Sequence, residues 1–336
     1  MHANELTAEA LRLAIEDAAA SRRGLEVEVA ASACTRPVLA QIRFGHLAPT
    51  ASAGALDIHV QLEPLRGSPV SEFWIANGAV QHGSSGPIRY ASDSQHLFGV
   101  IEMDEREHGG IVAAAATAYE AMAEFQRHCA FPHLLRMWNY LDDINAGDGD
   151  DERYRQFCVG RSRGLRDLNA AGFPAATAIG HQHTTGRLQV FWLAARTPGT
   201  AVENPRQISA YRYPRVHGPA SPTFARATLA GDRTLLISGT ASIVGHSSVH
   251  ADDVVAQVDE TVRNMTALRA LALQQTPHRR TLLKVYVRHP ADVETIASRL
   301  RAVLPPELAA HEVIYLAADI CRRELLLEIE GIQIPT

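Results

Sequence analysis

The sequence predicts an α+β fold made of two similar units, each a small mixed sheet covered by two helices. Two observations predict this fold. First, the spacing of apolar residues gives the same order of elements, β-α-β-α-β-β, twice along the chain. Second, residues 134–138 (LLRMW) of the first unit occupy the same place in that order as residues 282–286 (LLKVY) of the second. We interpret the two units as a diverged duplication.

The first 70 residues precede the repeated pattern and are predicted to form an N-terminal extension. An apolar stripe through Leu11, Ile15 and Ala18 predicts a surface helix over residues 6–20. Gly and Pro punctuate the apolar stretches that follow, which predicts short strands over 25–30, 38–44 and 56–62. No catalytic motif is recognisable in this segment.

The two units are predicted to span residues 71–200 and 201–336. In the first unit we expect strands over 96–102, 134–141, 175–179 and 187–194, with helices over 111–128 and 152–169. In the second we expect strands over 234–238, 281–287, 312–317 and 325–329, with helices over 254–271 and 291–303.

The last predicted strand carries the acidic residue that is central to the functional hypothesis. Apolar residues of 325–329 alternate on one face, and Glu328 and Glu330 point the other way. One interpretation is an edge strand with solvated carboxylates, which is where most acidic side chains lie. The other makes Glu328 a catalytic acid in a cleft. The first unit has the apolar residues 191–193 (FWL) where the second has 327–329 (LEI), so only the second carries the acid.

Composition argues against several classes of function. The chain of 336 residues has a formal net charge of −5 and no basic stripe, so nucleic acid is not an expected partner. No apolar run reaches membrane-spanning length, and the N-terminus lacks the features of a secretory signal. The cysteines form no CxxC pair, so we expect a reduced, cytoplasmic protein without a zinc site.

Two polar clusters have some features of metal sites. His181 and His183 share a strand face, but no acidic or cysteine ligand follows at metal spacing, so an exposed pair is the preferred interpretation. The aspartates of residues 142–151 lack the spacing and the terminal glutamate of an EF-hand, and a solvated loop is expected there. The sequence predicts neither a metal nor an organic cofactor.

Three stretches of the second unit resemble the Rid (reactive intermediate deaminase) family of small trimeric proteins. Residues 218–222 (GPASP) are similar to the GPYSQ opening of that family, 236–240 (LISGT) to its FVSGQ strand, and 327–330 (LEIE) to its closing VEIE. The resemblance implies tandem Rid-like units, chorismate-mutase-like in their β-α-β-α-β-β order, with a cleft where the two sheets meet. Because a duplication can replace one subunit contact, both a monomer and a homotrimer are open.

Four separated motifs resemble a more specific family, the chorismatases. They are residues 136–140 (RMWNY), 204–214 (NPRQISAYRYP) continuing through 218–227 (GPASPTFARA), 238–246 (SGTASIVGH) and 321–331 (CRRELLLEIEG), and the similarity runs from about residue 72 to the C-terminus. That family cleaves pyruvate from chorismate. Its members leave a dihydroxycyclohexadiene carboxylate, 3-hydroxybenzoate, or both 3- and 4-hydroxybenzoate, the last group for pigment and ubiquinone biosynthesis in xanthomonad-like bacteria.

The resemblance implies a lyase that converts chorismate to 3-hydroxybenzoate, with 4-hydroxybenzoate as a further product, and pyruvate. An enol ether must be protonated on carbon, which requires a carboxylic acid of raised pKa, and Glu328 matches that acid. Cys321 matches the cysteine of benzoate-forming members and is expected to steer an epoxide-like intermediate. Subtypes vary at Ser242, which leaves the ratio of products open.

The expected substrate-binding residues follow from the chemistry of a dianion and from motif position. Arginine binds carboxylates with two parallel hydrogen bonds, and Arg212 and Arg323 are favoured, while Arg161 and Arg215 are further candidates. The other candidates are aromatic or polar residues, arginines and small residues of the motifs: Tyr211, Tyr213, Asn139, Tyr140, Arg136, Arg163, Gly239, Thr240 and Ala241.

Three other functions are weighed against this hypothesis. A chorismate hydrolase would add water and give the dihydroxycyclohexadiene carboxylate. A Rid-type imine hydrolase would leave the chorismatase motifs without a role. A non-catalytic sensor of small carboxylates would keep its ligand binding when Glu328 is changed to Gln.

Overall fold

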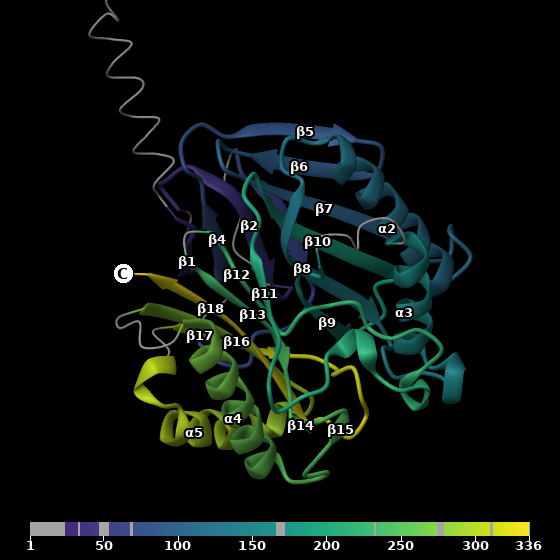
Figure 1. Ribbon diagram of the computed structural model, residues 1–336, viewed down its shortest axis with the longest axis vertical. Helices are drawn as coiled ribbons and strands as arrows, with labels where there is room; N and C mark the ends of the chain where they lie inside the picture. Colours follow the sequence, from purple (N-terminus) through teal and green to yellow (C-terminus); the bar gives the residue numbers. More distant parts are fainter. Residues whose placement is uncertain are drawn as a thin grey trace, which may run out of the picture.

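The computed structural model of the protein describes residues 24–32, 34–46, 54–67, 70–165, 172–231, 233–273, 279–309 and 312–335. Within these residues the chain forms three main sheets, one from the N-terminal extension and one from each predicted unit (Figure 1). The helix predicted over residues 6–20 lies outside the described residues.

The N-terminal extension forms a four-stranded sheet in the order β1-β4-β2-β3. Its strands are β1 (Glu26–Ala30), β2 (Val38–Phe44), β3 (Leu56–Val60) and β4 (Ser71–Ile75). The three strands expected from the sequence are present. The additional strand β4 is buried on both faces, so it shows no alternation of polar and apolar residues that would predict a strand.

The first unit forms a six-stranded sheet in the order β5-β6-β7-β10-β8-β9. Its elements are β5 (Gln81–Ser85), β6 (Ile88–Ser92), β7 (His96–Asp104), α2 (Ile111–His128), β8 (His133–Asp142), α3 (Arg153–Gly164), β9 (Ala175–His181) and β10 (Arg187–Ala195). All pairings are antiparallel except β8 with β9, because α3 crosses over between these two strands.

The second unit forms a sheet in the order β11-β12-β13-β18-β16-β17. Its elements are β11 (Thr200–Val202), β12 (Ala227–Leu229), β13 (Leu235–Thr240), α4 (Val254–Leu273), β16 (Arg279–Val287), α5 (Val293–Val303), β17 (Glu312–Ala317) and β18 (Leu327–Pro335). A small hairpin, β14 (Ile243–Val244) with β15 (Ser247–Ser248), precedes α4.

The two six-stranded sheets have the same strand order, with the one parallel pair at the same place. The predicted fold class is therefore confirmed: each unit is a mixed sheet with two helices. Each sheet also contains two strands that precede the predicted pattern and were not expected. They are β5 and β6 in the first sheet, and β11 and β12 in the second. Sequence periodicity did not reveal them because β5 is polar and exposed and β11 has three residues. The domain boundaries at residues 70 and 200 stay a prediction.

The register of the strands corrects the comparison of the two units by one residue. In the first sheet Trp138 pairs with Phe191, and at the same place in the second sheet Tyr286 pairs with Glu328. Phe191, rather than Trp192, therefore occupies the place of the acid. The difference matters because a shift of one residue in a strand moves a side chain to the opposite face of the sheet.

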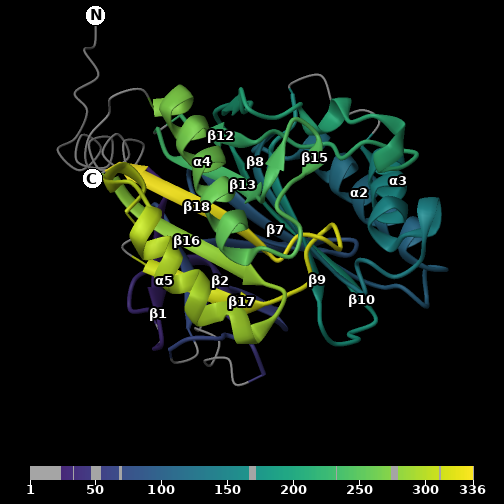
Figure 2. The ribbon, with the colours of Figure 1, turned by 90° about the horizontal axis from the view of Figure 1, so that it is seen from below.

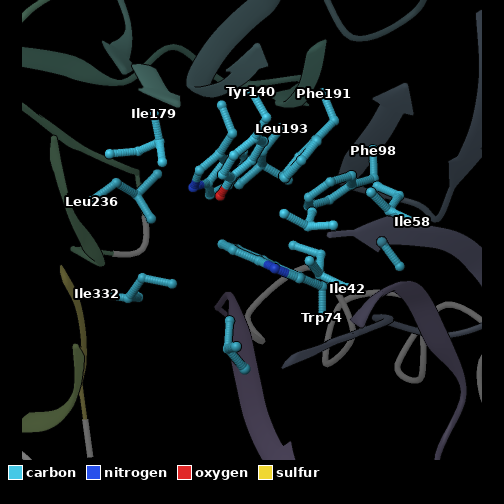
Figure 3. Packing of buried hydrophobic residues seen from close by; sticks show 14 of the residues in the cluster. Ile42, Ile58, Trp74, Phe98, Tyr140, Ile179, Phe191, Leu193, Leu236 and Ile332 are labelled. Atoms are coloured by element: carbon cyan, nitrogen blue, oxygen red, sulfur yellow. The ribbon is translucent and has the colours of Figure 1, made fainter. Parts of the chain in front are cut away.

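The three sheets surround one hydrophobic core. Ile42, Ile58 and Trp74 of the N-terminal sheet meet residues of both other sheets there, including Phe191 and Leu236 (Figure 3). The helices lie outside this ring, with α2 and α3 on the first sheet and α4 and α5 on the second (Figures 1 and 2). One face of each six-stranded sheet is thus packed against helices and the other against the shared core.

Four charged side chains cross the centre of the molecule, where the sheets meet. Nζ of Lys284 lies 2.8 Å from Oε2 of Glu72 and 2.7 Å from Oε1 of Glu330, and Nη2 of Arg136 lies 2.8 Å from Oε2 of Glu330. None of these side chains is more than 4% exposed. Burial alone would lower the pKa of Lys284, but Glu330 and Glu72 raise it. We call these four residues the charge array; its two cations and two carboxylates balance.

The last strand begins and ends later than the sequence predicts. It was expected over 325–329 but spans Leu327–Pro335, because its pairing with β16 continues to the C-terminal side as far as Arg279. Leu325 and Leu326 instead belong to the loop before it. The carbonyl oxygen of Leu325 accepts a hydrogen bond from Nε of Arg288, which directly follows β16. The backbone N–H of Leu326 donates to Oε1 of Gln257 in α4.

Changing Lys284 to Met should destabilise the protein by about 3–5 kcal/mol, because it leaves the buried Glu72 carboxylate without its cation. The double change Glu72→Leu with Lys284→Met removes both charges of that pair, while Glu330 keeps Arg136. We expect it to recover most of the loss in urea-unfolding experiments. If the double variant is as unstable as the single one, or less stable, charge balance is not what the array provides.

Candidate active site

The main pocket lies between the two units and has a volume of about 400 Å³. Its floor comes from the edge strand β9 of the first sheet and from β13 of the second. The two strands are joined by a hydrogen bond from the Gly239 N–H to Oγ1 of Thr177 (3.0 Å). Its walls come from α3 and from the segments 147–149, 213–226 and 321–324. Parts far apart in the sequence are therefore needed to form it.

Glu328 lies at the bottom of this pocket and is 4% exposed. The ladder between β13 and β18 is irregular between Ile237 and Thr240, opposite the carboxyl group. A Cβ atom on Gly239 would lie 1.8 Å from Oε1 of Glu328, so only glycine leaves room for the carboxyl group at this position. Sγ of Cys321 lies 3.9 Å from Oε2 on the other side.

Glu328 and Glu330 have opposite protonation states, although they point to the same face of one strand. Burial raises the pKa of Glu328 to about 8, and the negative charge of Glu330 adds to this, against Arg136 and Arg226. Burial also disfavours the charge on Glu330, but Lys284 and Arg136 lower its pKa to about 2. At neutral pH Glu328 therefore carries a proton that it can donate, and Glu330 does not.

Thr177 connects the pocket with the charge array. Its hydroxyl contacts Nη2 of Arg136 and accepts the N–H of Gly239, and its side chain lines the pocket. Arg136 itself does not line the pocket. The guanidinium of Arg136 thus acts on Glu328 through its charge and through Thr177, from behind the wall of the site.

Two buried arginines line the pocket without an ion-pair partner among the described residues. Arg161 is 3% exposed and donates to the carbonyl oxygen of Thr223 (2.9 Å); Arg226 is 4% exposed and donates to the hydroxyl of Tyr213 (2.7 Å). In each, Nε has no hydrogen-bond acceptor within the described chain. A buried cation without a counter-ion is costly, so both groups are suited to bind an anionic ligand.

Further charged residues surround the mouth of the pocket. Arg322 donates to the His246 carbonyl oxygen (2.9 Å) and the Ser248 hydroxyl (3.0 Å). Nε2 of His217 lies 3.0 Å from Nδ1 of His246. Burial, with Arg322, His246 and Arg155, lowers the pKa of His217 to about 4. The imidazole is therefore neutral at pH 7, and the cations at the mouth are guanidinium groups.

Besides Arg161, six of the residues that the sequence nominated line the pocket: Glu328, Cys321, Tyr213, Arg323, Gly239 and Ala241. Arg323 lies at the mouth, where it donates to the carbonyl oxygen of Asn145 (2.7 Å) and binds Asp148. Burial, with the charge of Glu328, raises the pKa of the Cys321 thiol, so it is not a thiolate. These six positions keep their predicted roles as hypotheses.

The structure does not bring the other nominated residues to the pocket lining. Three of them are exposed outside it: Arg212 beside the Tyr211 ring, Arg163 at the end of α3, and Arg215, which forms an ion pair with Asp150. Two are buried and hydrogen-bonded to tyrosine side chains: Asn139 to Tyr119, and Tyr140 to Tyr286. Whether a candidate side chain lines the pocket, is exposed or is buried elsewhere depends on tertiary contacts, which the sequence motifs do not show. The remaining three are Arg136 in the charge array, Tyr211 and Thr240.

The sequence-based analysis missed several residues that line the pocket. Arg226 lies within the motif that ends at residue 227, but a single arginine in a loop has no pattern that separates it from a surface arginine. Tyr154 and Arg155 lie in the first turn of α3, in the first unit, which has no counterpart of Glu328. The missed set also includes Thr177, His217 and Arg322.

The two polar clusters do not form metal sites in the described part of the chain. No group of three His, Cys, Asp or Glu side chains there could hold a metal ion. His181 is buried rather than exposed, with Nδ1 3.2 Å from Oδ1 of Asp142, whereas His183 is exposed. Among the described helices, none has the length and apolar character needed to cross a membrane.

Comparison with known proteins identifies close relatives. Residues 72–194 match a family model described as chorismatase FkbO/Hyg5-like, N-terminal. A 3-hydroxybenzoate synthase of Streptomyces hygroscopicus is 34% identical over 84% of this chain and 87% of its own. A chorismatase of Streptomyces rapamycinicus is 34% identical over 86% and 90%. A crystal structure of a chorismatase superposes with a TM-score of 0.80 at 31% identity, covering 92% of this chain and 98% of that one.

The raised pKa of Glu328 predicts a pH dependence of stability. The folded protein keeps a proton that the unfolded chain releases between pH 4.5 and about 8. The free energy of unfolding should therefore fall as the pH rises through this range, by about 1.4 kcal/mol for each tenfold difference in proton affinity. Glu328→Gln has no proton to release, so its stability relative to the unchanged protein should increase from pH 5 to pH 8 in urea unfolding. An unchanged difference would show that Glu328 ionises normally.

Proposed function

The chain belongs to the chorismatase family, and we propose that it cleaves chorismate to pyruvate and 3-hydroxybenzoate, with 4-hydroxybenzoate as a second aromatic product. The observation that supports this proposal most is the combination of groups in the pocket. A protonated carboxyl group lies at the bottom of a pocket that also holds two buried arginines without carboxylate partners among the described residues.

Substrate binding is assigned to Arg161 and Arg226. Chorismate carries two carboxylates, and each needs a donor that stays charged at every physiological pH. The guanidinium groups come from the two different units, one from α3 and one from the loop before β12, so a dianion between them would span the boundary. Arg322 and Arg155 at the mouth add positive charge that favours the entry of an anion.

The first chemical step is protonation of the enol ether. Glu328 gives its proton to the methylene carbon, which produces an oxocarbenium-like species. The ring C–O bond then breaks and its electron pair leaves with pyruvate, while the oxygen of the neighbouring hydroxyl bonds to the same ring carbon. The proton of that hydroxyl returns to the Glu328 carboxylate. The acid is thus restored, and an epoxide remains on the ring.

The second step opens the epoxide to give an aromatic ring. Breaking one of its two C–O bonds leaves oxygen at carbon 3, and breaking the other leaves it at carbon 4; loss of the ring hydrogen then gives the hydroxybenzoate. No water is consumed, so a dry pocket favours this route over the hydrolytic one. We assign Cys321 to this step because its apolar, protonated thiol occupies the space beside Glu328.

Changing Glu328 to Gln should lower pyruvate release by about 100-fold or more, because the amide cannot supply the proton. Pyruvate is measured by a coupled assay, and the aromatic products by mass-resolved chromatography. The matched control is Glu324→Gln at the mouth. Burial would raise the pKa of Glu324, but Ser248 and Arg322 hold it below its usual value, so it is not an acid at neutral pH.

The products of this experiment separate the alternatives. Hydroxybenzoate and pyruvate in equal amounts support the proposal, and the dihydroxycyclohexadiene carboxylate would identify a chorismate hydrolase. Turnover by Glu328→Gln at the original rate would remove Glu328 from the mechanism. Binding of chorismate without any turnover, unaffected by the substitution, would identify a carboxylate sensor.

Changing Arg226 to Lys should raise the KM for chorismate about tenfold, which corresponds to a loss of about 1.4 kcal/mol. Lysine keeps the charge but cannot form two parallel bonds to a carboxylate. The matched control is Arg212→Lys, an exposed arginine outside the pocket lining, for which we expect an unchanged KM. The opposite pattern would assign the carboxylate to Arg212, as its position in the sequence motif suggests.

A further inference from the structure

One loop supplies four residues of the pocket wall, and it contains no helix and only an isolated β-bridge, at Asp319. It connects β17 to β18 across residues 318–326 and carries Cys321, Arg322, Arg323 and Glu324. Its own backbone contributes one turn, in which the Leu325 N–H donates to the Arg322 carbonyl oxygen (3.1 Å). A loop of this length with so little internal bonding needs an external group to hold one shape.

Gln257 of α4 holds the C-terminal end of the loop, at Glu324 and Leu326. The part that contains Cys321 is held by Arg288, which directly follows β16. Its guanidinium makes four hydrogen bonds to the loop. Nε donates to the Leu325 carbonyl oxygen (2.8 Å), Nη1 to Oδ1 of Asp319 (2.8 Å), and Nη2 to the carbonyl oxygens of Ile320 (3.0 Å) and Arg322 (2.9 Å). The last two acceptors are the carbonyl oxygens of the residues immediately before and after Cys321. Arg288 therefore fixes the backbone at Cys321 directly.

Arg288 is itself held in place. Its backbone N–H donates to the Leu326 carbonyl oxygen (3.0 Å), and its carbonyl oxygen accepts from Nε2 of Gln182 (2.7 Å). Its side chain is 12% exposed, and it is not part of the pocket lining. The loop is also tied to the first unit, because Asp319 and Gly180 exchange two backbone hydrogen bonds of 2.8 and 2.9 Å. The guanidinium is thus a rigid template on the far side of the loop from the substrate.

We infer that Arg288 is a positioning residue that fixes Cys321 beside Glu328 and thereby determines how the intermediate divides among the products. The inference rests on the proposed function. Lysine cannot replace Arg288, because its three N–H donors share one nitrogen, whereas the four acceptors here are spread around a planar fork. A displaced Cys321 leaves space beside Glu328 for water, which favours the hydrolytic product.

The first experiment compares product distributions. In Arg288→Lys, kcat should fall on the order of 10- to 100-fold, since a displacement of about 1 Å has effects of this size. The share of 3-hydroxybenzoate among all products should fall as well. The matched control is Arg280→Lys, an arginine within β16 that binds the backbone carbonyl oxygen of Val27 and the carboxylate of Glu312, away from the pocket. It should lose stability only.

A double-mutant cycle tests whether Arg288 acts through Cys321. In the Cys321→Ala background, Arg288→Lys should no longer change the product distribution, although it still lowers stability. An equal change in both backgrounds, or a lower kcat with an unchanged distribution, would overturn the inference. If Arg288→Lys does not fold, Asp319→Ala serves in its place, because it removes one of the four acceptors and leaves Arg288 intact.

A second readout does not depend on chorismate. The rate at which iodoacetamide alkylates Cys321 is measured by peptide mass spectrometry, with the half-buried Cys129 as an internal reference. Arg288→Lys should raise the ratio of the two rates, because the loop no longer holds the half-buried thiol against Glu328. An unchanged ratio contradicts the inference even if the enzyme makes hydroxybenzoate. A raised ratio in a protein that makes none supports the placement of the loop and overturns the proposed function instead.

Discussion

The charge array at the centre of the molecule is the constraint on which the other features of the site depend. Glu72, Arg136, Lys284 and Glu330 come from three sheets, and their charges cancel in a region without solvent access. Glu328 stands beside a carboxylate that already has its counter-ions, and ionising it would add an uncompensated charge. Burial between the sheets, together with the negative charge of Glu330, therefore raises the pKa of Glu328 and keeps it protonated, against the opposing charge of Arg136.

The duplicated architecture explains why the pocket lies where it does. Each unit covers one face of its sheet with helices and turns the other toward the shared core, so the open position is the seam where β9 meets β13. The first unit places Phe191 in the core at the position of Glu328. In the first unit this position of β10 packs in the core, whereas in the second unit the same position of β18 places Glu328 at the seam beside Gly239.

The loop of residues 318–326 links this architecture to selectivity. A protonated acid can start the cleavage of an enol ether in any pocket of suitable shape, but the fate of the intermediate depends on what stands next to it. Here the neighbour is the Cys321 thiol, held by Arg288 from outside the pocket. In the proposed mechanism, reactivity and selectivity thus belong to separate elements, the strand β18 and the loop before it.

The sequence by itself determined the two-unit α+β fold and the family, and it nominated Glu328, because these depend on local periodicity and on short contiguous motifs. Among the arginines it favoured Arg212, which is exposed outside the pocket lining, named Arg161 only as a further candidate, and did not select Arg226, which is buried in the pocket wall. It also gave no sign of Thr177, of the charge array or of Arg288. Those features join residues from different sheets, and whether a charged side chain is buried, paired or free to bind a ligand is decided only by the neighbours that the tertiary structure brings to it.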